Sequence, residues 1–148
     1  MTADPAADRL ALRELVDAYA IAADRADGPG AATLFVPAGR MTLWLDPERD
    51  EPTGERVGRE QIAATIDSLS RYRATHHAVS SSSVVVDGDR ARGVTMCVAH
   101  HLEGDPTARR TRVLFIRYDD AFVRHDGAWR FERRDLHVQW EQVEDATP

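Results

Sequence analysis

Lysine is missing altogether from the 148-residue chain, so all 19 basic side chains are arginines. This absence excludes an enzyme that forms a lysine Schiff base with a carbonyl substrate. Cysteine occurs only once, at Cys97. A single cysteine excludes an intrachain disulfide and a cysteine-ligated zinc cluster. We expect Cys97 to be a small, buried strand residue.

Excess positive charge and long apolar runs are also lacking. The formal net charge of −6 argues against nucleic acid or an anionic membrane as a partner. No basic-apolar leader begins the chain, and no run of apolar residues is long enough to span a bilayer, so we expect a cytoplasmic protein. The length fits a single domain, and 43% hydrophobic residues can supply a core.

Hydrophobic periodicity predicts helices first and strands afterwards. Helices are expected over 8–26, 31–35 and 59–70, and strands over 40–45, 109–123 and 128–140, with a hairpin between them. We expect 46–58 to be a surface loop, and 1–7 and 141–148 to be loose tails of one domain spanning 1–148. This order is typical of an α+β protein. Three N-terminal helices packed on a strongly curved, mostly antiparallel sheet would enclose a conical small-molecule cavity.

The hairpin turns near Asp87-Gly88-Asp89-Arg90, and each of its arms ends in two histidines. If the loop is Gly88-Asp89, His77 lies directly across from His100. If the loop is one residue earlier, His100 is diagonal to His77. Both registers place His77 and His100 on one face, because side chains alternate along a strand, and only a bulge or a longer loop would break this parity.

The second histidine pair, His76 and His101, is expected on the opposite face, at solvent or at an interface. His77 and His100 would end a partly apolar strip, where a carboxylate could orient and charge them. The alternative is two solvated histidines at strand ends.

The helix over 8–26 offers a carboxylate and a phenol near its end. Asp24 follows three apolar residues, and Tyr19 lies about 140° from it around the helix. The two side chains could therefore flank one cavity only from different sides. Tyr19 also fits an ordinary core position, and Asp24 could simply pair with an arginine such as Arg25 or Arg134.

Several marks in fixed order resemble the SnoaL-like branch of the NTF2-like superfamily, which includes scytalone dehydratase and bile acid 7α-dehydratase. These marks run over about Asp8 to Trp140 and are Tyr19-x4-Asp24-x2-Asp27, Gly58-Arg59-Glu60-x-Ile62, Thr75-His76-His77, Ala99-His100, Tyr118-Asp119 and Asp126-Gly127-x-Trp129. The resemblance implies a cone-shaped fold, commonly a homodimer or homotrimer. It does not by itself imply one function, because the fold hosts several chemistries.

The resemblance also implies roles for single residues. Asp24 and His77 match the aspartate–histidine pair of the dehydratases, His100 matches a second pocket histidine, and Tyr19 matches a helix tyrosine. Trp44 and Tyr118 stand near substrate contacts but differ from the family residues there. Arg134 is a further candidate for contact with an anionic substrate.

We therefore expect a cofactor-independent dehydratase for a hydrophobic hydroxy-carbonyl compound, polyketide-like or steroid-like. His77 would move the proton, Asp24 would orient His77, and Tyr19, Tyr118 or a water on His100 would stabilise an enolate. Isomerisation or cyclisation would begin with the same step. Two different functions also fit these residues: a metal site held by Asp24, His77 and His100, and a non-catalytic carrier that uses only the cavity.

Overall fold

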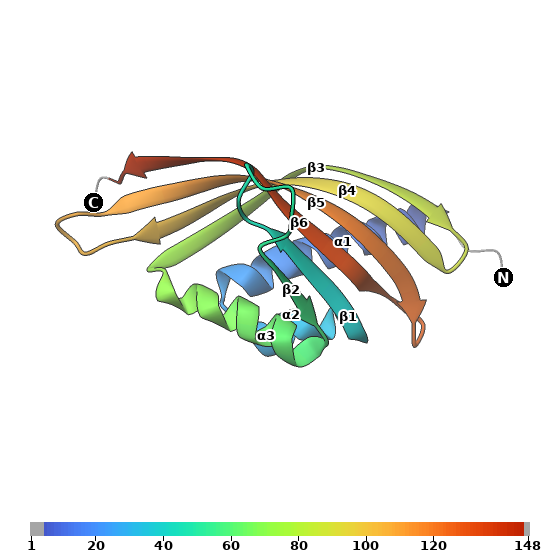
Figure 1. The fold of residues 1–148 in the computed structure, drawn as a ribbon. Coiled ribbons are helices and arrows are strands. Elements are labelled where there is room, and N and C mark those ends of the chain that lie inside the picture. Colours follow the sequence, from blue (N-terminus) through green and yellow to red (C-terminus); the bar gives the residue numbers. More distant parts are fainter. Residues whose placement is uncertain (1–4, 147–148) are drawn as a thin grey trace.

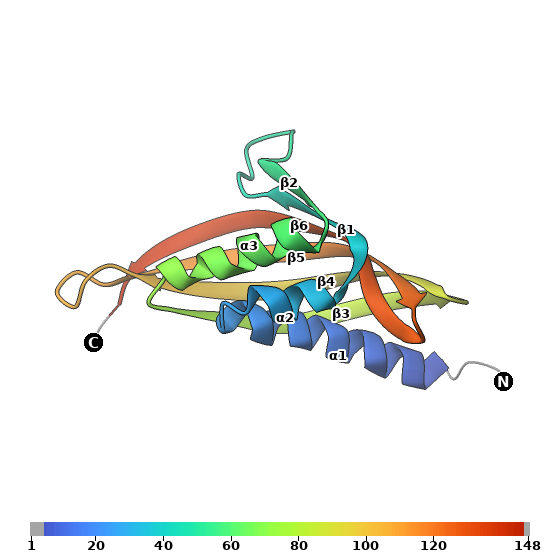
Figure 2. The same ribbon diagram turned by 90° about the horizontal axis from the view of Figure 1, so that it is seen from below.

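Six strands form one curved sheet, and the helices cover one of its faces (Figures 1 and 2). The computed structural model describes residues 5–146. The strand order is β2-β1-β6-β5-β4-β3. The elements are α1 (Pro5–Asp24), α2 (Gly28–Thr33), β1 (Phe35–Trp44), β2 (Gly54–Val57), α3 (Arg59–Asp67), η1 (Ser68–Arg71), β3 (Ala74–Asp87), β4 (Arg90–Glu103), β5 (Arg110–His125) and β6 (Ala128–Asp145). The predicted α+β class and curved sheet are confirmed.

Helix α1 lies against the sheet through one apolar face. Its buried residues recur at helical spacing, from Leu12 through Val16 and Tyr19 to Ala23. Asp8 lies in the first turn of the helix and is buried. Its carboxylate accepts hydrogen bonds from Arg124 Nη2 at 2.7 Å and Trp129 Nε1 at 2.9 Å. Asp8 therefore ties the start of α1 to the β5–β6 hairpin.

Several expected boundaries were wrong. Helix α2 covers Gly28–Thr33 instead of 31–35, and β1 begins at Phe35 instead of residue 40. The segment 46–58 is not all loop, because β2 pairs antiparallel with β1 inside it. The tail after 140 is not loose: β6 continues to Asp145, which pairs with Arg110. Residues 5–7 already belong to α1, and the other expected tail positions, 1–4 and 147–148, lie outside the described residues. Alternation of apolar and polar residues is weak in β2 and at the end of β6, so the pattern did not reveal these strand segments.

The β3–β4 hairpin decides which histidines meet. Its loop is Gly88-Asp89, since Asp87 pairs with Arg90. The register then shifts between Val79 and Ser82, so that one extra residue stands on β3. Beyond this bulge His77 pairs with Ala99 instead of His100. His77 therefore shares the inner face, toward the helices, with His101 rather than with His100.

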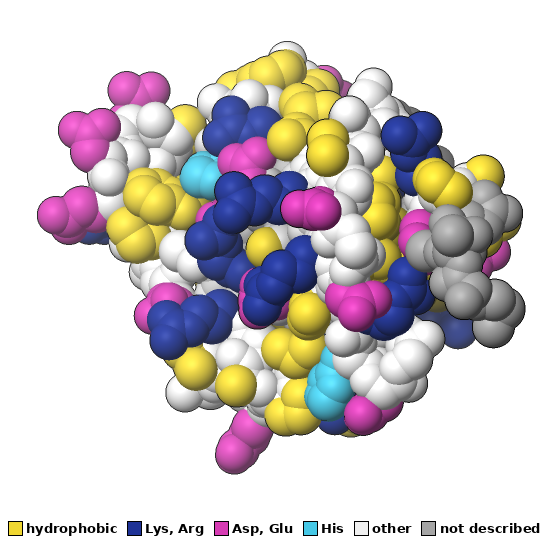
Figure 3. Space-filling model, turned by 90° about the vertical axis from the view of Figure 1, so that its right-hand side faces the viewer, with side chains coloured by type: hydrophobic (Ala, Val, Ile, Leu, Met, Phe, Trp, Pro, Cys, Tyr) yellow, Lys and Arg dark blue, Asp and Glu magenta, His cyan; other side chains and the backbone are white. Residues whose placement is uncertain are grey.

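The outer face of the sheet carries charged side chains that are largely paired. Figure 3 shows arginines gathered on the side where the β3–β4 and β5–β6 hairpins end. Arg40 lies 3.2 Å from Glu55, and Arg133 lies 3.2 Å from Asp135. Because the arginine of each pair is more than half exposed, each pair contributes little to stability.

Candidate active site

Asp24 and His77 form a hydrogen-bonded pair at the inner surface of β3. Asp24 is the last residue of α1, and its Oδ1 lies 2.7 Å from His77 Nδ1. The same carboxylate accepts hydrogen bonds from the His77 backbone N–H, at 3.0 and 3.1 Å, and from Thr75 Oγ1, at 3.0 Å. The predicted approach of helix carboxylate to imidazole is therefore present in the structure.

Several donors fix the carboxylate in its ionised form. Burial by itself raises the pKa of Asp24, but the hydrogen bonds from the His77 side chain and backbone outweigh it, and the pKa is lowered overall. An ionised Asp24 accepts the Nδ1 proton of His77 and so leaves the lone pair of the neutral ring on Nε2. The His77 side chain is only 7% exposed, which shields this arrangement from water.

His101 is the second imidazole of the site, and sequence reasoning missed it. Its ring centroid lies 5.5 Å from that of His77 and 4.4 Å from the Tyr72 ring. Burial, then the nearby His77 and Arg71, lower the pKa of His101 to about 4, so the ring is neutral at pH 7. Within the described chain, neither of its buried nitrogens has a hydrogen-bond partner. A buried polar ring without partners is a natural contact for a ligand.

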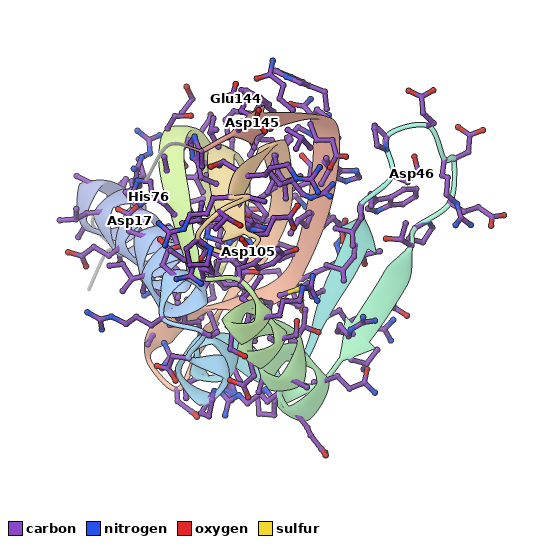
Figure 4. The ribbon with its side chains drawn as sticks, turned by 90° about the vertical axis from the view of Figure 1, so that its left-hand side faces the viewer. Asp17, Asp46, His76, Asp105, Glu144 and Asp145 are labelled. Carbon is purple, nitrogen blue, oxygen red and sulfur yellow. The ribbon has the colours of Figure 1, made fainter. Side chains whose placement is uncertain are left out.

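His100 lies on the other face, which corrects its expected place beside His77. It pairs with His76, at a ring-centroid distance of 6.4 Å. The side chain of His76 is 74% exposed, and its Nδ1 remains 3.9 Å from Asp24 Oδ2. Figure 4 labels His76 on the β3 side of the molecule. The physical cause is the bulge, whose extra residue changes the parity of the strand.

A cavity of about 370 Å³ opens beside His77 and His101. Its wall is mainly apolar, with a few charged residues: Tyr19, Ala23, Met41, Leu43, Leu45, Thr65, Ile66, Ser68, Leu69, Arg71, Tyr72, His77, His101, Glu103, Arg112, Leu114, Ile116, Tyr118, Leu136, Val138 and Glu141. Figure 4 looks at the end of the molecule that carries Asp105 in the β4–β5 loop and Glu144 near the end of β6. The volume suits a small organic molecule.

Both predicted tyrosines line this pocket. Tyr19 comes from α1 and Tyr118 from β5, and their ring centroids lie 6.0 Å apart. Burial raises the pKa of Tyr19 to about 12 and places that of Tyr118 well above its usual value. Both phenols therefore keep their protons at neutral pH and can act as donors.

Arg134 does not line the pocket, contrary to the expectation of a substrate contact. Its guanidinium donates two hydrogen bonds of 2.8 Å to Asp120, and both side chains are fully buried. The guanidinium carbon lies 4.3 Å from the Tyr19 ring centre and 4.0 Å from that of Tyr118. Arg134 thus packs behind the two tyrosines and fixes their positions.

Trp44 also lies elsewhere than expected. Strand β1 places Met41 and Leu43 on the inner face, so Trp44 points outward. Its ring stacks on His137 at 5.3 Å. Leu43, one residue earlier, supplies the pocket contact that the sequence assigned to Trp44.

A metal site finds no support in the geometry. It needs Asp24, His77 and His100 together, and His100 is on the far face. Residues 5–146 contain no group of three or more histidine, cysteine or acidic side chains placed to hold a metal ion.

The arrangement of helices, sheet and pocket can now be set beside known proteins. A family model described as a SnoaL-like domain matches residues 4–135. The chain belongs to the SnoaL-like family. The predicted membership of the NTF2-like superfamily is thereby confirmed, and no curated protein sequence gives a match.

Solved structures share the SnoaL-like fold of this chain over nearly its whole length. A "Putative Scytalone Dehydratase" from Novosphingobium aromaticivorans is 22% identical, with a TM-score of 0.77 over 96% of this chain and 93% of that chain. Kfla4162 from Kribbella flavida is 22% identical, with a TM-score of 0.80 over 94% and 95%. Hexachlorocyclohexane dehydrochlorinase LinA-type3 from Novosphingobium barchaimii is 17% identical, with a TM-score of 0.77 over 93% and 90%. At these identities the likeness establishes the fold alone.

Among the described residues, no helix is both long and apolar enough to cross a membrane.

Proposed function

We propose that this SnoaL-like protein is a cofactor-independent acid–base enzyme that removes water from a hydroxy-carbonyl compound with an apolar body. One observation carries the proposal: the 2.7 Å contact between Asp24 and His77 at the wall of a largely apolar cavity. A perturbed carboxylate that orients a buried imidazole beside a cavity is a common arrangement for general base catalysis.

The reaction would proceed by β-elimination. His77 Nε2 takes the proton from the carbon next to the carbonyl, and the electron pair of that C–H bond moves into an enolate. The enolate reforms the carbonyl, a new C=C bond forms, and the C–O bond to the β-hydroxyl breaks. The leaving hydroxide takes the proton back from His77 and departs as water. Asp24 stabilises the intermediate imidazolium, and such positioned acid–base catalysis supplies on the order of 10²–10⁴-fold.

The developing enolate oxygen needs hydrogen-bond donors inside the cavity. Tyr118 and Tyr19 keep their protons because burial raises the pKa of both phenols. The neutral ring of His101 offers one more N–H, and no other described residue competes for it. Donors fixed in place before the reaction stabilise developing charge without reorganisation.

The names of the similar structures agree with an elimination. One is described as a dehydratase and another as a dehydrochlorinase. Loss of water and loss of hydrogen chloride both remove a proton and a leaving group from one substrate. The fold is compatible with this chemistry, and the substrate of this chain is a matter for experiment.

Proton abstraction can be tested before the true substrate is known. Apolar β-hydroxy ketones and their dehydrated products are incubated with the protein in D₂O, and NMR follows deuterium at the carbon next to the carbonyl. We expect exchange and water loss with the native protein, and neither with His77→Ala. Exchange without water loss would favour an isomerase or cyclase. A panel compound that binds in the cavity without exchanging would favour a non-catalytic carrier and contradict the proposal.

A further inference from the structure

A second cavity lies on the same side of the sheet, at the other end of α1. We call it the serine groove. It has a volume of about 440 Å³ and is lined by Arg9, Leu12, Arg13, Val16, Ser82, Ser83, Val84, Gly93, Thr95 and Phe122. None of these residues lines the cavity beside His77 and His101, which we call the histidine pocket. Figure 2 shows α1 running alongside β3, the strand that supplies the three consecutive groove residues.

Helix α1 forms one wall of the groove through a single face. Arg9, Leu12, Arg13 and Val16 follow each other at intervals of three, one and three residues, so they stand side by side. The continuation of α1 supplies Tyr19 to the histidine pocket. Helix α1 thus lines both cavities, with arginines in the serine groove and with Tyr19 in the histidine pocket.

The opposite wall owes its shape to the β3 bulge and to a glycine. Ser82 follows the bulge directly and pairs with Thr95 of β4. Gly93 has no side chain to place in the groove; a Cβ there would come within 3.3 Å of the Phe122 ring and 3.0 Å of the Ser83 carbonyl oxygen. A residue larger than glycine would therefore crowd this wall.

The polar groups of the groove are those that bind oxyanions. Arg13 donates to Asp17 at 3.0 Å and to the Ser80 carbonyl at 3.3 Å, so this arginine is already engaged. Within residues 5–146, the side chain of Arg9 makes neither an ion pair nor a hydrogen bond. A guanidinium beside hydroxyl donors matches carboxylate and phosphate oxygens.

Hydroxyl groups add to this charge from the sheet side. Ser82 Oγ lies 3.3 Å from Thr95 Oγ1, and Thr95 is only 2% exposed. Beside the hydroxyls, Leu12 is 2% and Phe122 is 3% exposed, and Val16 completes an apolar base. The groove therefore combines a cationic and hydroxyl-lined rim with a hydrocarbon floor.

We propose that the serine groove binds an amphiphile that has an oxyanion head, a carboxylate or a phosphate monoester, and a short apolar tail. Arg9 and the Ser82 hydroxyl hold the head, and the tail lies on Leu12, Val16 and Phe122. Ser83 pairs with the exposed Val94, so its side chain is on the other face of the sheet. This inference is independent of the chemistry at His77. It gives the protein a second ligand site on the helix that also carries Asp24.

The test is a titration of the whole protein with octyl phosphate, octanoate, octanol and inorganic phosphate, followed by ¹H–¹⁵N NMR. The two anionic octyl compounds are expected to shift amide signals of residues 82–84 and 93 before those of residues 77 and 101. The ratio of the affinities for octyl phosphate and octanoate shows whether the groove prefers a phosphate or a carboxylate head. Octanol and inorganic phosphate should each bind more weakly, because octanol lacks the oxyanion head and inorganic phosphate lacks the apolar tail.

Arg9→Ala should weaken the anionic ligands about tenfold, the value of one charge-assisted hydrogen bond. Arg9 is exposed, so this variant should melt like the native protein. Arg71→Ala, at the histidine pocket, is the matched control and should leave groove binding unchanged. Equal binding of octanol, equal affinity in Arg9→Ala, or signals that shift first at 77 and 101 would each overturn the proposal. His77→Ala should still bind at the groove whether or not it is inactive.

Discussion

Strands β3 and β4 carry two histidine pairs, His77 with His101 on the inner face and His76 with His100 on the outer face. The two pairs differ in burial and in their partners. On the inner face, His77 is 7% exposed at its side chain and bonded to Asp24, and His101 is buried beside it. On the outer face, His76 is 74% exposed. The exposed His76 also lies near Asp24, but at 3.9 Å, whereas the buried His77 is bonded to it at 2.7 Å. Only the inner imidazole combines a bonded carboxylate with a dry wall. Residue type alone therefore says little about which histidine matters.

The largest expected effect concerns the carboxylate that distinguishes the inner pair. Asp24→Asn should lower turnover on the order of 10²–10⁴-fold, because the amide cannot stabilise the His77 cation. The measurement is the rate of water loss or deuterium exchange on a compound that the native protein turns over.

His100→Ala is the matched control from the outer face and should keep native turnover. If both variants were equally active, the inner pair would have no special role and the comparison would fail.

Two neighbouring aspartates extend the comparison to stability. Asp120→Ala should lower the free energy of unfolding by about 3–5 kcal/mol, because it leaves the buried Arg134 unpaired. Asp119→Ala, on the outer face, removes partly exposed contacts to Arg117 and His137 and should change it by about 1 kcal/mol or less. Urea unfolding of both variants measures the difference.

A replacement of the whole pair, Asp120→Leu with Arg134→Met, should recover much of the loss, since no lone charge stays buried. No recovery would mean that the contacts of Arg134 with the tyrosine rings matter more than its charge.

The pH dependence of stability should report on His101. Its pKa falls to about 4 in the folded protein from 6.5, so the unfolded chain binds more protons between these values. Stability should therefore be complete above pH 6.5 and decline as the pH falls toward 4. Thermal melts across this range are expected to show a shallower decline in His101→Phe than in the native protein. An unchanged slope would place His101 in contact with water.

The smallest effect contrasts two adjacent residues of β1. Leu43→Ala removes apolar surface from the pocket and should weaken binding of an apolar ligand about tenfold, at about 1.5 kcal/mol for part of a leucine side chain. Trp44→Ala, on the outer face, should leave ligand affinity unchanged, although the substitution is larger. Calorimetric titration with one ligand of the panel measures both affinities. A larger loss of affinity for Trp44→Ala would show that Trp44 contacts the ligand.

Local signals predicted much of this architecture. The apolar spacing of α1 and the approach of Asp24 to His77 are as expected, and the hairpin loop is one of the two registers left open, because each depends on short-range periodicity or on family marks. The family resemblance was confirmed by the family model over residues 4–135.

Two errors arose from features that a local sequence pattern does not show. His101 was assigned to the wrong face because one bulge residue in a run of serines changes the parity of β3. The serines Ser80–Ser83, unusual in a strand, were the only sign of irregularity there. Arg134 was taken for a substrate contact, since no local pattern shows that Asp120 pairs with it across the sheet. Long-range pairing of this kind is not encoded in a window of neighbouring residues.

The parallel contact between β1 and β6 has a consequence for how the molecule assembles. Strand β1 supplies Met41 and Leu43 to the pocket, yet its neighbours in the sheet are the short β2 and the last strand of the chain. Arg40 pairs with Arg133, across most of the sequence. Contacts between such distant segments form slowly because a long loop must close first. A ribosome must therefore have released the chain through His137 before this wall of the cavity can exist, and until then its leucine and methionine remain open to chaperones.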